Sequence, residues 1–285
     1  MKKRHKLHIS LILAACSLNA YATQVGNIDD FDGALTDYTI KRGTKTIPMQ
    51  VYAPLYHDDH IHISDNHSID IRQCGEIHKI THKESPYQVQ SKKCNVIGLT
   101  DNIWLAMKDF VKYVVTIVHA PSKGVHTKSD KEPPAMPILD RIPGVTPTLK
   151  AGKRALALQW FGGKSPYQVQ ITTAKKEVLW ETETKAQSVK TEKIHLKAEQ
   201  TYWIIITANH AKPPLEREFK AVAKLPDYPA QLQDNTLPEN MRRALQAGWL
   251  AKQDRIKWSF EAYQQVFDIA DNYGPARVLR EALVH

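Results

Sequence analysis

The chain has 285 residues, of which 42% are hydrophobic and 24% are charged, and its 39 Lys and Arg outnumber its 30 Asp and Glu to give a net charge of +9. A chain of this length usually folds as two domains, each large enough to bury a core. The basic excess is mild and is no evidence for a nucleic-acid-binding protein, and the three cysteines include no CxxC pair that would indicate redox catalysis.

Residues 1–22 have the pattern of a secretory signal peptide. Four basic residues precede the short apolar run Ile9–Ala15, and small residues at Ala20 and Ala22 fit the positions that a signal peptidase reads. The apolar run is far too short for a transmembrane span, which needs about 20 residues. We therefore expect a periplasmic protein whose net charge falls from +9 to about +5, because the signal peptide carries four positive charges and no negative ones.

A second cleavage pattern overlaps the first. Leu13-Ala14-Ala15-Cys16 resembles a bacterial lipoprotein box, in which the cysteine becomes the lipidated first residue. Soluble release after Ala22 is the preferred interpretation, and a lipid anchor on Cys16 is the alternative. The anchor would change where the protein resides, but not how it folds.

A first β region follows a polar stretch. Residues 23–33 contain three aspartates and predict a mobile leader. Beyond them, apolar and polar residues alternate in short stretches about 8–12 residues apart, which is typical of a small antiparallel barrel or sandwich. The predicted strands cover residues 38–42, 46–52, 60–63, 68–72, 77–81 and 87–91.

The next segment predicts a helix and then a linker. Asp101 is placed to cap a helix over residues 103–118, whose apolar residues mostly recur at helical spacing. Residues 119–137 are charged, rich in proline and poor in apolar residues, which predicts an interdomain linker. The first domain is therefore expected to cover residues 34–118.

Residues 138–226 predict a second β unit. Six or seven short strands over about 85 residues indicate an immunoglobulin-like or fibronectin-type-III-like sandwich. The region has no cysteine, so the antibody-type disulfide is absent, and Trp160 and Trp203 are interpreted as core residues. The predicted strands cover residues 155–160, 167–173, 178–184, 188–196, 201–208 and 219–225.

The last part, residues 236–285, predicts a helical tail. Thr236 can cap a first helix in which Met241, Leu245 and Trp249 recur every four residues. A second helix follows and ends before Gly274-Pro275, after which a short last helix begins. Amphipathic helices must bury one face, and the sandwich is the nearest partner in the sequence.

One hexapeptide occurs twice. Ser85-Pro86-Tyr87-Gln88-Val89-Gln90 is repeated 80 residues later, from Ser165 to Gln170, but the flanking residues differ. A domain duplication would show more similarity. We interpret both copies as the start of a strand, with Pro at the entry and Tyr and Val on one face.

A histidine-rich stretch is the candidate metal site. His60 and His62 alternate with two isoleucines, so on a strand they share one face and, together with Asp58 or His67, could bind zinc or copper. A solvated strand surface shows the same pattern, so metal binding is kept as an alternative.

No motif predicts a catalytic residue or a cofactor. Gly163-Lys164-Ser165 lacks the first glycine of a phosphate-binding loop, because Leu158 stands at that position. The chain contains no GxSxG elbow and no HExxH motif. The sequence therefore predicts a protein that is not an enzyme.

The first β region carries a family resemblance. Its residues include, in order, Arg42-Gly43, Val51, Ala53-Pro54-Leu55-Tyr56, Asp59, Ile61 and Ser68-Ile69-Asp70-Ile71. In these residues, positions 35–90 resemble the extracytoplasmic domain of the FecR-like family. The resemblance implies a small antiparallel β domain in a non-enzymatic envelope protein, and it transfers no catalytic residue. Exported proteins that pair such a domain with a sandwich and a short helical tail look similar throughout.

Together these patterns predict a mainly β protein, with a FecR-like β domain, an immunoglobulin-like sandwich and C-terminal helices. We expect a non-enzymatic periplasmic sensing, scaffolding or adaptor protein that binds another envelope component. The alternatives are a cell-wall glycan-binding module, which exposed aromatics on one sandwich face would favour, and a metal-binding periplasmic protein. Neither a nucleic-acid partner nor a transmembrane span is expected.

We predict that the exported protein begins at Thr23, because the basic start, the apolar core and the small residues coincide there. N-terminal sequencing of protein recovered from the periplasm tests this. A first residue that is a lipid-modified Cys16 would show that the lipoprotein peptidase acts instead.

We predict a disulfide between Cys74 and Cys94, the two cysteines that remain after cleavage at Ala22. An even count in an oxidising compartment favours pairing over two separate thiols. The closed loop would stabilise the fold by about 3 kcal/mol. Non-reducing mass spectrometry of the native protein should show one cross-linked peptide pair, and two thiols open to alkylation would contradict it.

Overall fold

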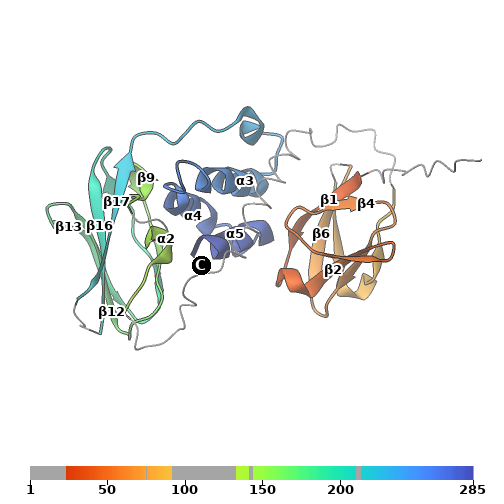
Figure 1. Cartoon of the computed structure of the whole chain (residues 1–285), viewed down its shortest axis with the longest axis horizontal. Helices are drawn as coiled ribbons and strands as arrows, with labels where there is room; N and C mark the ends of the chain where they lie inside the picture. The colour runs from red at the N-terminus through yellow and green to blue at the C-terminus, as the bar shows by residue number, and fades with distance from the viewer. Residues whose placement is uncertain (1–23, 75, 92–132, 141–143, 210–212, 285) are drawn as a thin grey trace, which may run out of the picture.

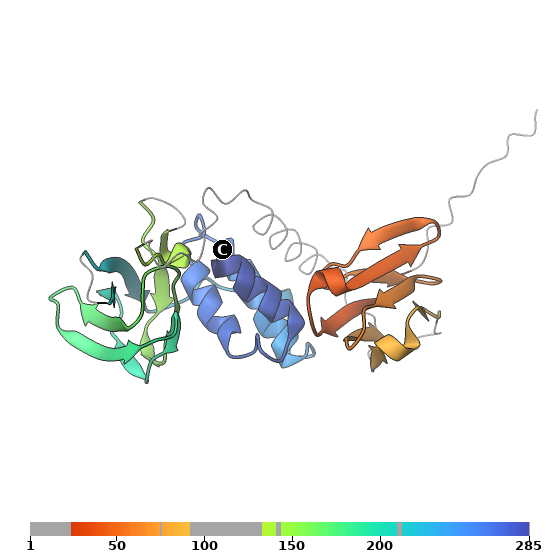
Figure 2. The ribbon, with the colours of Figure 1, turned by 90° about the horizontal axis from the view of Figure 1, so that it is seen from below.

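The computed structural model describes residues 24–74, 76–91, 133–140, 144–209 and 213–284. The fold is mainly β with C-terminal helices, as the sequence predicts. The helices lie between two β units, with the N-terminal unit on one side and the sandwich on the other (Figures 1 and 2).

The first β unit consists of two four-stranded antiparallel sheets. Their inward residues, such as Ile28, Leu55, Ile61 and Ile71, are completely buried. In spatial order, one sheet contains β4 (Pro54–Tyr56), β1 (Gln24–Phe31), β6 (Ser68–Gln73) and β7 (Glu76–Thr81). The other contains β3 (Lys45–Pro48), β2 (Tyr38–Arg42), β5 (His60–Ile63) and β8 (Tyr87–Gln88).

The expected leader is an interior strand, so that prediction was wrong. β1 pairs with both β4 and β6. Its polar residues hide the strand pattern, because several of them are buried and satisfied inside the fold. Asp29 is only 6% exposed and accepts a hydrogen bond of 2.8 Å from Arg72 of the neighbouring strand β6. A buried carboxylate with a charged partner is compatible with a strand interior.

A charged network closes the turn between β4 and β5. Asp59 is completely buried and accepts two hydrogen bonds of 2.8 Å from the Arg42 guanidinium. Arg42 also donates to the carbonyl of Pro54 and lies 4.1 Å from the centre of the Tyr56 ring. The residues on which the family resemblance rests therefore meet in space, and a bidentate pair of this kind fixes geometry as well as charge.

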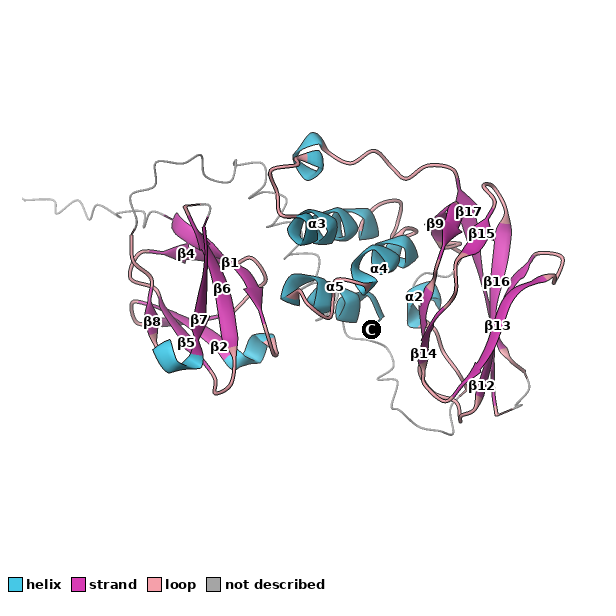
Figure 3. Cartoon of the chain, turned by 180° about the vertical axis from the view of Figure 1, so that it is seen from behind, coloured by secondary structure: helices cyan, strands magenta, loops and turns pink. Residues whose placement is uncertain are grey.

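The second β unit is a sandwich (Figure 3). Its larger sheet contains, in spatial order, β13 (Val178–Thr184), β12 (Tyr167–Thr173), β16 (Thr201–Ala208), β17 (Leu215–Val222) and β9 (Thr148–Lys150). Two strand pairs supply the other layer: β10 (Gly152–Arg154) with β15 (Ile194–Leu196), and β11 (Ala157–Gln159) with β14 (Ser188–Lys190). β9 and β17 are parallel, and the other pairs are antiparallel.

The two predicted core tryptophans differ. Trp160 is completely buried and meets the Tyr167 ring edge to face at 5.3 Å. Trp203 is only partly buried, because it alternates with the inward residues Tyr202 and Ile204 along β16. It lies on the outer face, with the ammonium of Lys176 at 4.9 Å from its ring, so its assignment to the core was wrong.

The end of the predicted linker belongs to the sandwich. Ala135 forms an isolated bridge with Phe161, and Met136 is completely buried. The short helix α2 (Pro137–Asp140) follows, and Asp140 accepts a hydrogen bond from Arg217 of β17. Residues 119–132 of the linker and the predicted helix over residues 103–118 lie outside the described residues.

Three helices form the tail: α3 (Glu239–Ala251), α4 (Ser259–Phe267) and α5 (Gly274–Val284). The predicted apolar faces are buried, including Met241 and Leu245 of α3. Thr236 was wrongly predicted as a cap. Its hydroxyl donates to Asp234, and α3 begins after Pro238.

Helix α4 is fixed to the sandwich by polar contacts. Glu261 is 3% exposed and accepts hydrogen bonds from the Lys150 amide at 3.0 Å and the Arg154 guanidinium at 2.7 Å. The Gln264 side chain bonds both the amide and the carbonyl of Ala157, as a neighbouring strand would. The tail therefore covers backbone groups of β9 and β11.

The repeated hexapeptide adopts the same local structure in both units. Both Ser-Pro bonds are cis, and each leads into a strand, β8 in one case and β12 in the other. Val89 and Val169 are both completely buried. The repeat is thus a strand entry, as predicted.

Candidate functional site

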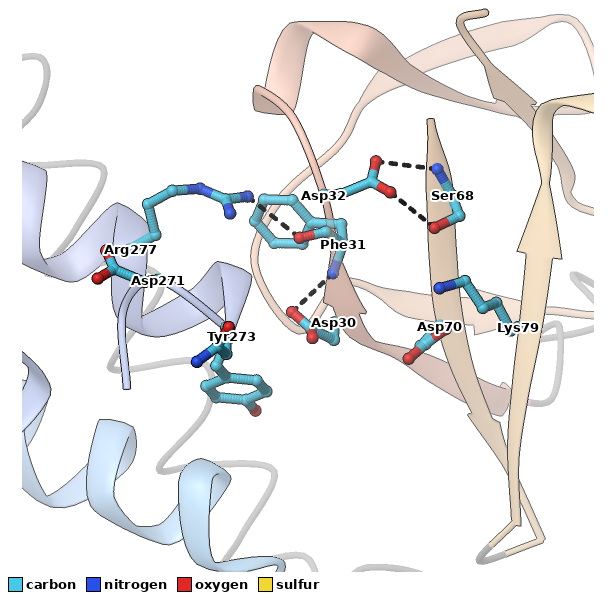
Figure 4. A pocket seen from close by; sticks show the side chains of 10 residues that line it. Asp30, Phe31, Asp32, Ser68, Asp70, Lys79, Asp271, Tyr273 and Arg277 are labelled. Carbon is cyan, nitrogen blue, oxygen red and sulfur yellow. Dashed lines mark hydrogen bonds between the residues drawn. The ribbon is translucent and has the colours of Figure 1, made fainter. Parts of the chain in front are cut away.

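A polar cavity lies where the helical tail meets the first β unit (Figure 4). We call it the junction cavity; its volume is about 150 Å³. It is lined from strands β1, β6 and β7 on one side and from α5 and the turn before it on the other. Its lining residues are Asp30, Phe31, Asp32, Ser68, Asp70, Lys79, Asp271, Asn272, Tyr273 and Arg277.

Asp30 caps helix α5. Its Oδ1 accepts a hydrogen bond of 2.5 Å from the amide of Gly274, the first residue of the helix. The first amides of a helix have no partner inside it, so a carboxylate there supplies the missing acceptor and complements the helix dipole. A side chain at Gly274 would not fit, because its Cβ would lie 2.5 Å from the carbonyl oxygen of Phe31.

Two further contacts close the junction. The Arg277 guanidinium donates to the carbonyls of Phe31 and Gly33, at 3.1 and 2.8 Å. Deeper inside, the hydroxyls of Tyr52 and Tyr273 share a hydrogen bond of 2.9 Å, and burial raises the pKa of both phenols. Tyr52 has a φ of 57°, a conformation that a bulky residue keeps only where its surroundings impose it.

Asp32 joins β1 to β6 at the rim of the cavity. Its carboxylate accepts hydrogen bonds from the Ser68 amide, the Ser68 hydroxyl and the Tyr38 hydroxyl, at 2.9, 2.7 and 2.9 Å. Burial alone would raise its pKa, but these bonds and one to His67 outweigh burial and lower the pKa. Asp32 is therefore a structural anion.

Two other carboxylates behave in the opposite way. Burial raises the pKa of Asp30 above 3.8, and hydrogen bonds from the amides of Gly274 and Phe31 offset this only in part. Burial also raises the pKa of Asp70, against the opposing effect of Lys79. Because the folded-state pKa values are raised, protonation of these two groups favours the folded state, and this pH-dependent part of the stability is fully present below about pH 3.8 and is lost as the pH rises through the folded values. The hydrogen bond from Gly274 to Asp30 is a separate contribution, since a carboxylate also accepts it.

The predicted histidine site is divided between two places. His60 and His62 lie on β5, opposite Lys41 and Thr39 of β2. His67 instead directs Nδ1 at Asp32, at 3.0 Å, and Nε2 toward Asp37, at 3.5 Å.

Asp58 contributes its carbonyl to His60 Nδ1 at 3.1 Å, while its carboxylate accepts from Gln88. Within the described ranges, no group of three or more His, Cys, Asp or Glu is arranged to hold a metal ion. His67 was included among the predicted metal ligands only because it is close to His60 and His62 in the sequence.

Cys74 lies at the turn between β6 and β7, with a φ of 54°. Its expected partner Cys94 and the alternative lipidation site Cys16 lie outside the described residues. The disulfide and the lipid anchor stay predictions.

The chemistry of the junction cavity is that of a contact between units. Asp30 and Asp32 each accept a hydrogen bond from a backbone amide, and Arg277 donates hydrogen bonds to backbone carbonyls. The Arg280 side chain holds Asp271 at 2.8 Å. One sequence signal pointed to this site, the Gly274-Pro275 pair, since Pro is favoured in the first turn of a helix. The acceptor, Asp30, was assigned to the leader.

No family model matches the chain, and no curated protein matches it. The FecR-like resemblance therefore rests on the residues named above. In the part of the chain that the structure describes, no helix is both long enough and apolar enough to cross a membrane.

We predict that Asp30→Ala lowers the free energy of unfolding by about 1–2 kcal/mol, the usual effect of removing a helix cap. Asp30→Asn should cost much less, because its amide oxygen still accepts from Gly274. Urea unfolding at neutral pH measures both, and hydrogen exchange of the first turn of α5 shows whether the loss is local. Equal losses in the two variants would mean that the charge, and not the acceptor, stabilises the junction.

Proposed function

We propose that this protein is a non-enzymatic periplasmic adaptor that binds another envelope protein through its β units. The observation that carries the proposal is the position of the helical tail between those units. Helix α5 is bonded to β1 through Asp30 and Arg277, and helix α4 to the sandwich through Glu261 and Gln264. Such contacts set the spacing of two separate binding surfaces.

The exposed apolar residues support the same proposal. Among the described residues, the large hydrophobic side chains that remain exposed are Ile77, Val178 and Leu179, at 51%, 51% and 38%. All three lie on outer strands of their sheets, Ile77 on β7 and the other two on β13. Outer strands offer unpaired backbone groups to a further strand, and exposed apolar side chains beside them favour a protein partner.

The outer face of the sandwich gives less support to glycan binding. Trp203 is the aromatic residue that β16 places there, and glycan binding would need its ring face free. The Lys176 ammonium lies over that ring and is held by Glu216 at 3.1 Å. We therefore prefer a protein partner to a cell-wall glycan.

We predict that a photo-crosslinking residue at position 77 or 178 captures a discrete partner in intact cells, because these side chains are exposed on sheet edges. A probe at Lys193, an exposed residue between β14 and β15, is the matched control. Gel mobility and mass spectrometry of the adducts measure the result. Equal labelling at all three positions, or no adduct at all from a folded and exported protein, would contradict the adaptor function.

A further inference from the structure

Strand β13 is an outer strand whose free edge is open among the described residues. It pairs with β12 on one side and is the first strand in the order of the five-stranded sheet. The pairing is regular from Trp180 to Thr184 and is interrupted at Leu179, where a bulge shifts the register. The pairing resumes between Val178 and Thr172, and a bulge of this kind redirects side chains and disrupts the ladder locally. An added strand would therefore pair along Trp180–Thr184.

Carboxylates determine which strands can pair there. Glu181 and Glu183 lie opposite Gln170 and Gln168 of β12, and both are on the outer face of the sheet. Like charges on adjacent strands repel, so the edge disfavours a second copy of itself. The same charges favour a strand that carries Lys or Arg at two alternate positions.

A cavity adjoins the other end of the strand. It has a volume of about 510 Å³ and is lined by Leu179 and by three basic side chains, Lys175, His195 and Lys197, together with Glu177. The two lysines outweigh the single carboxylate of Glu177, so this end of β13 carries a net positive charge, whereas the Glu181 end is acidic. An extended ligand paired with this edge therefore lies beside carboxylates at its Glu183 end and beside lysines at its Leu179 end.

We propose that the edge of β13 binds the extended C-terminal segment of a partner protein, antiparallel to β13. An antiparallel strand runs from Thr184 toward Val178, so its terminal carboxylate arrives beside Lys175 and Lys197. Residues two positions apart share one face of a strand. The segment therefore carries Lys or Arg third and fifth from its end, opposite Glu181 and Glu183, and an apolar last residue against Leu179.

The partner segment is taken from another protein, because Leu283 and Val284, the last described residues, are buried within α5 and are not available to pair with β13. Backbone pairing would supply the affinity, while the carboxylate and the two basic residues would supply the specificity. The inference rests on the proposed function, because it names the kind of segment that the adaptor binds.

The test uses a fluorescent eight-residue peptide with Lys at the third and fifth positions from its end, Thr between them and a final Val. Binding to the full mature protein is measured by fluorescence anisotropy. The same peptide with a C-terminal amide, and one with Glu in place of both Lys, should each bind at least about tenfold more weakly, because charge pairs at an interface set specificity. Hydrogen exchange should show protection of residues 180–184 on binding.

Variants of the protein locate the site. Glu181→Lys with Glu183→Lys, and separately Lys197→Glu, should each weaken binding at least about tenfold, whereas Glu192→Lys, a change at an exposed residue outside β13, should leave it unchanged. Equal affinity for the acid and the amide, binding without protection of β13, or no binding at millimolar peptide would overturn the inference. If the peptide fails while a probe at Val178 still captures one partner in cells, the adaptor function stands and only this mode of binding is excluded.

Discussion

The amide of Gly274 donates its hydrogen bond to Asp30, which lies 244 positions earlier in the chain. This one contact requires that β1 is already a strand, that α5 begins at Gly274, and that no side chain separates their backbones. The neighbouring bonds from Arg277 to Phe31 and Gly33, and the shared bond between Tyr52 and Tyr273, depend on the same approach. The arrangement of the first β unit on the tail follows from it.

The sequence predicts best those elements whose pattern is local. Strands β5, β12, β13 and β16 have the predicted bounds, and each is rich in the β-branched and aromatic residues that favour strands. β1 was missed because its buried polar residues obtain their partners from distant segments, as Asp29 does from Arg72. Trp203 was misplaced for a different reason. A large aromatic side chain suits a core, but side chains of β16 alternate between the two faces of the sheet, and Trp203 lies on the outer face.

The candidate site was the least predictable part. Its residues come from β1, β6, β7 and α5, and only folding brings them together. His67 illustrates the converse, since nearness in sequence to His60 and His62 did not place it with them. The Arg42, Tyr56 and Asp59 network shows what a sequence signature can encode, because its members are separated in the chain but make a single contact.

The burial of the last helix has a consequence for biogenesis. Synthesis starts at the N-terminus, so β1 is made long before α5. The first β unit can pair its own strands early, yet Phe31 contacts Arg277 and Tyr52 bonds to Tyr273 only after residues 273–277 have been made. Premature termination before residue 273 would thus leave an uncovered patch on the first β unit, which is the kind of surface that proteases and chaperones recognise.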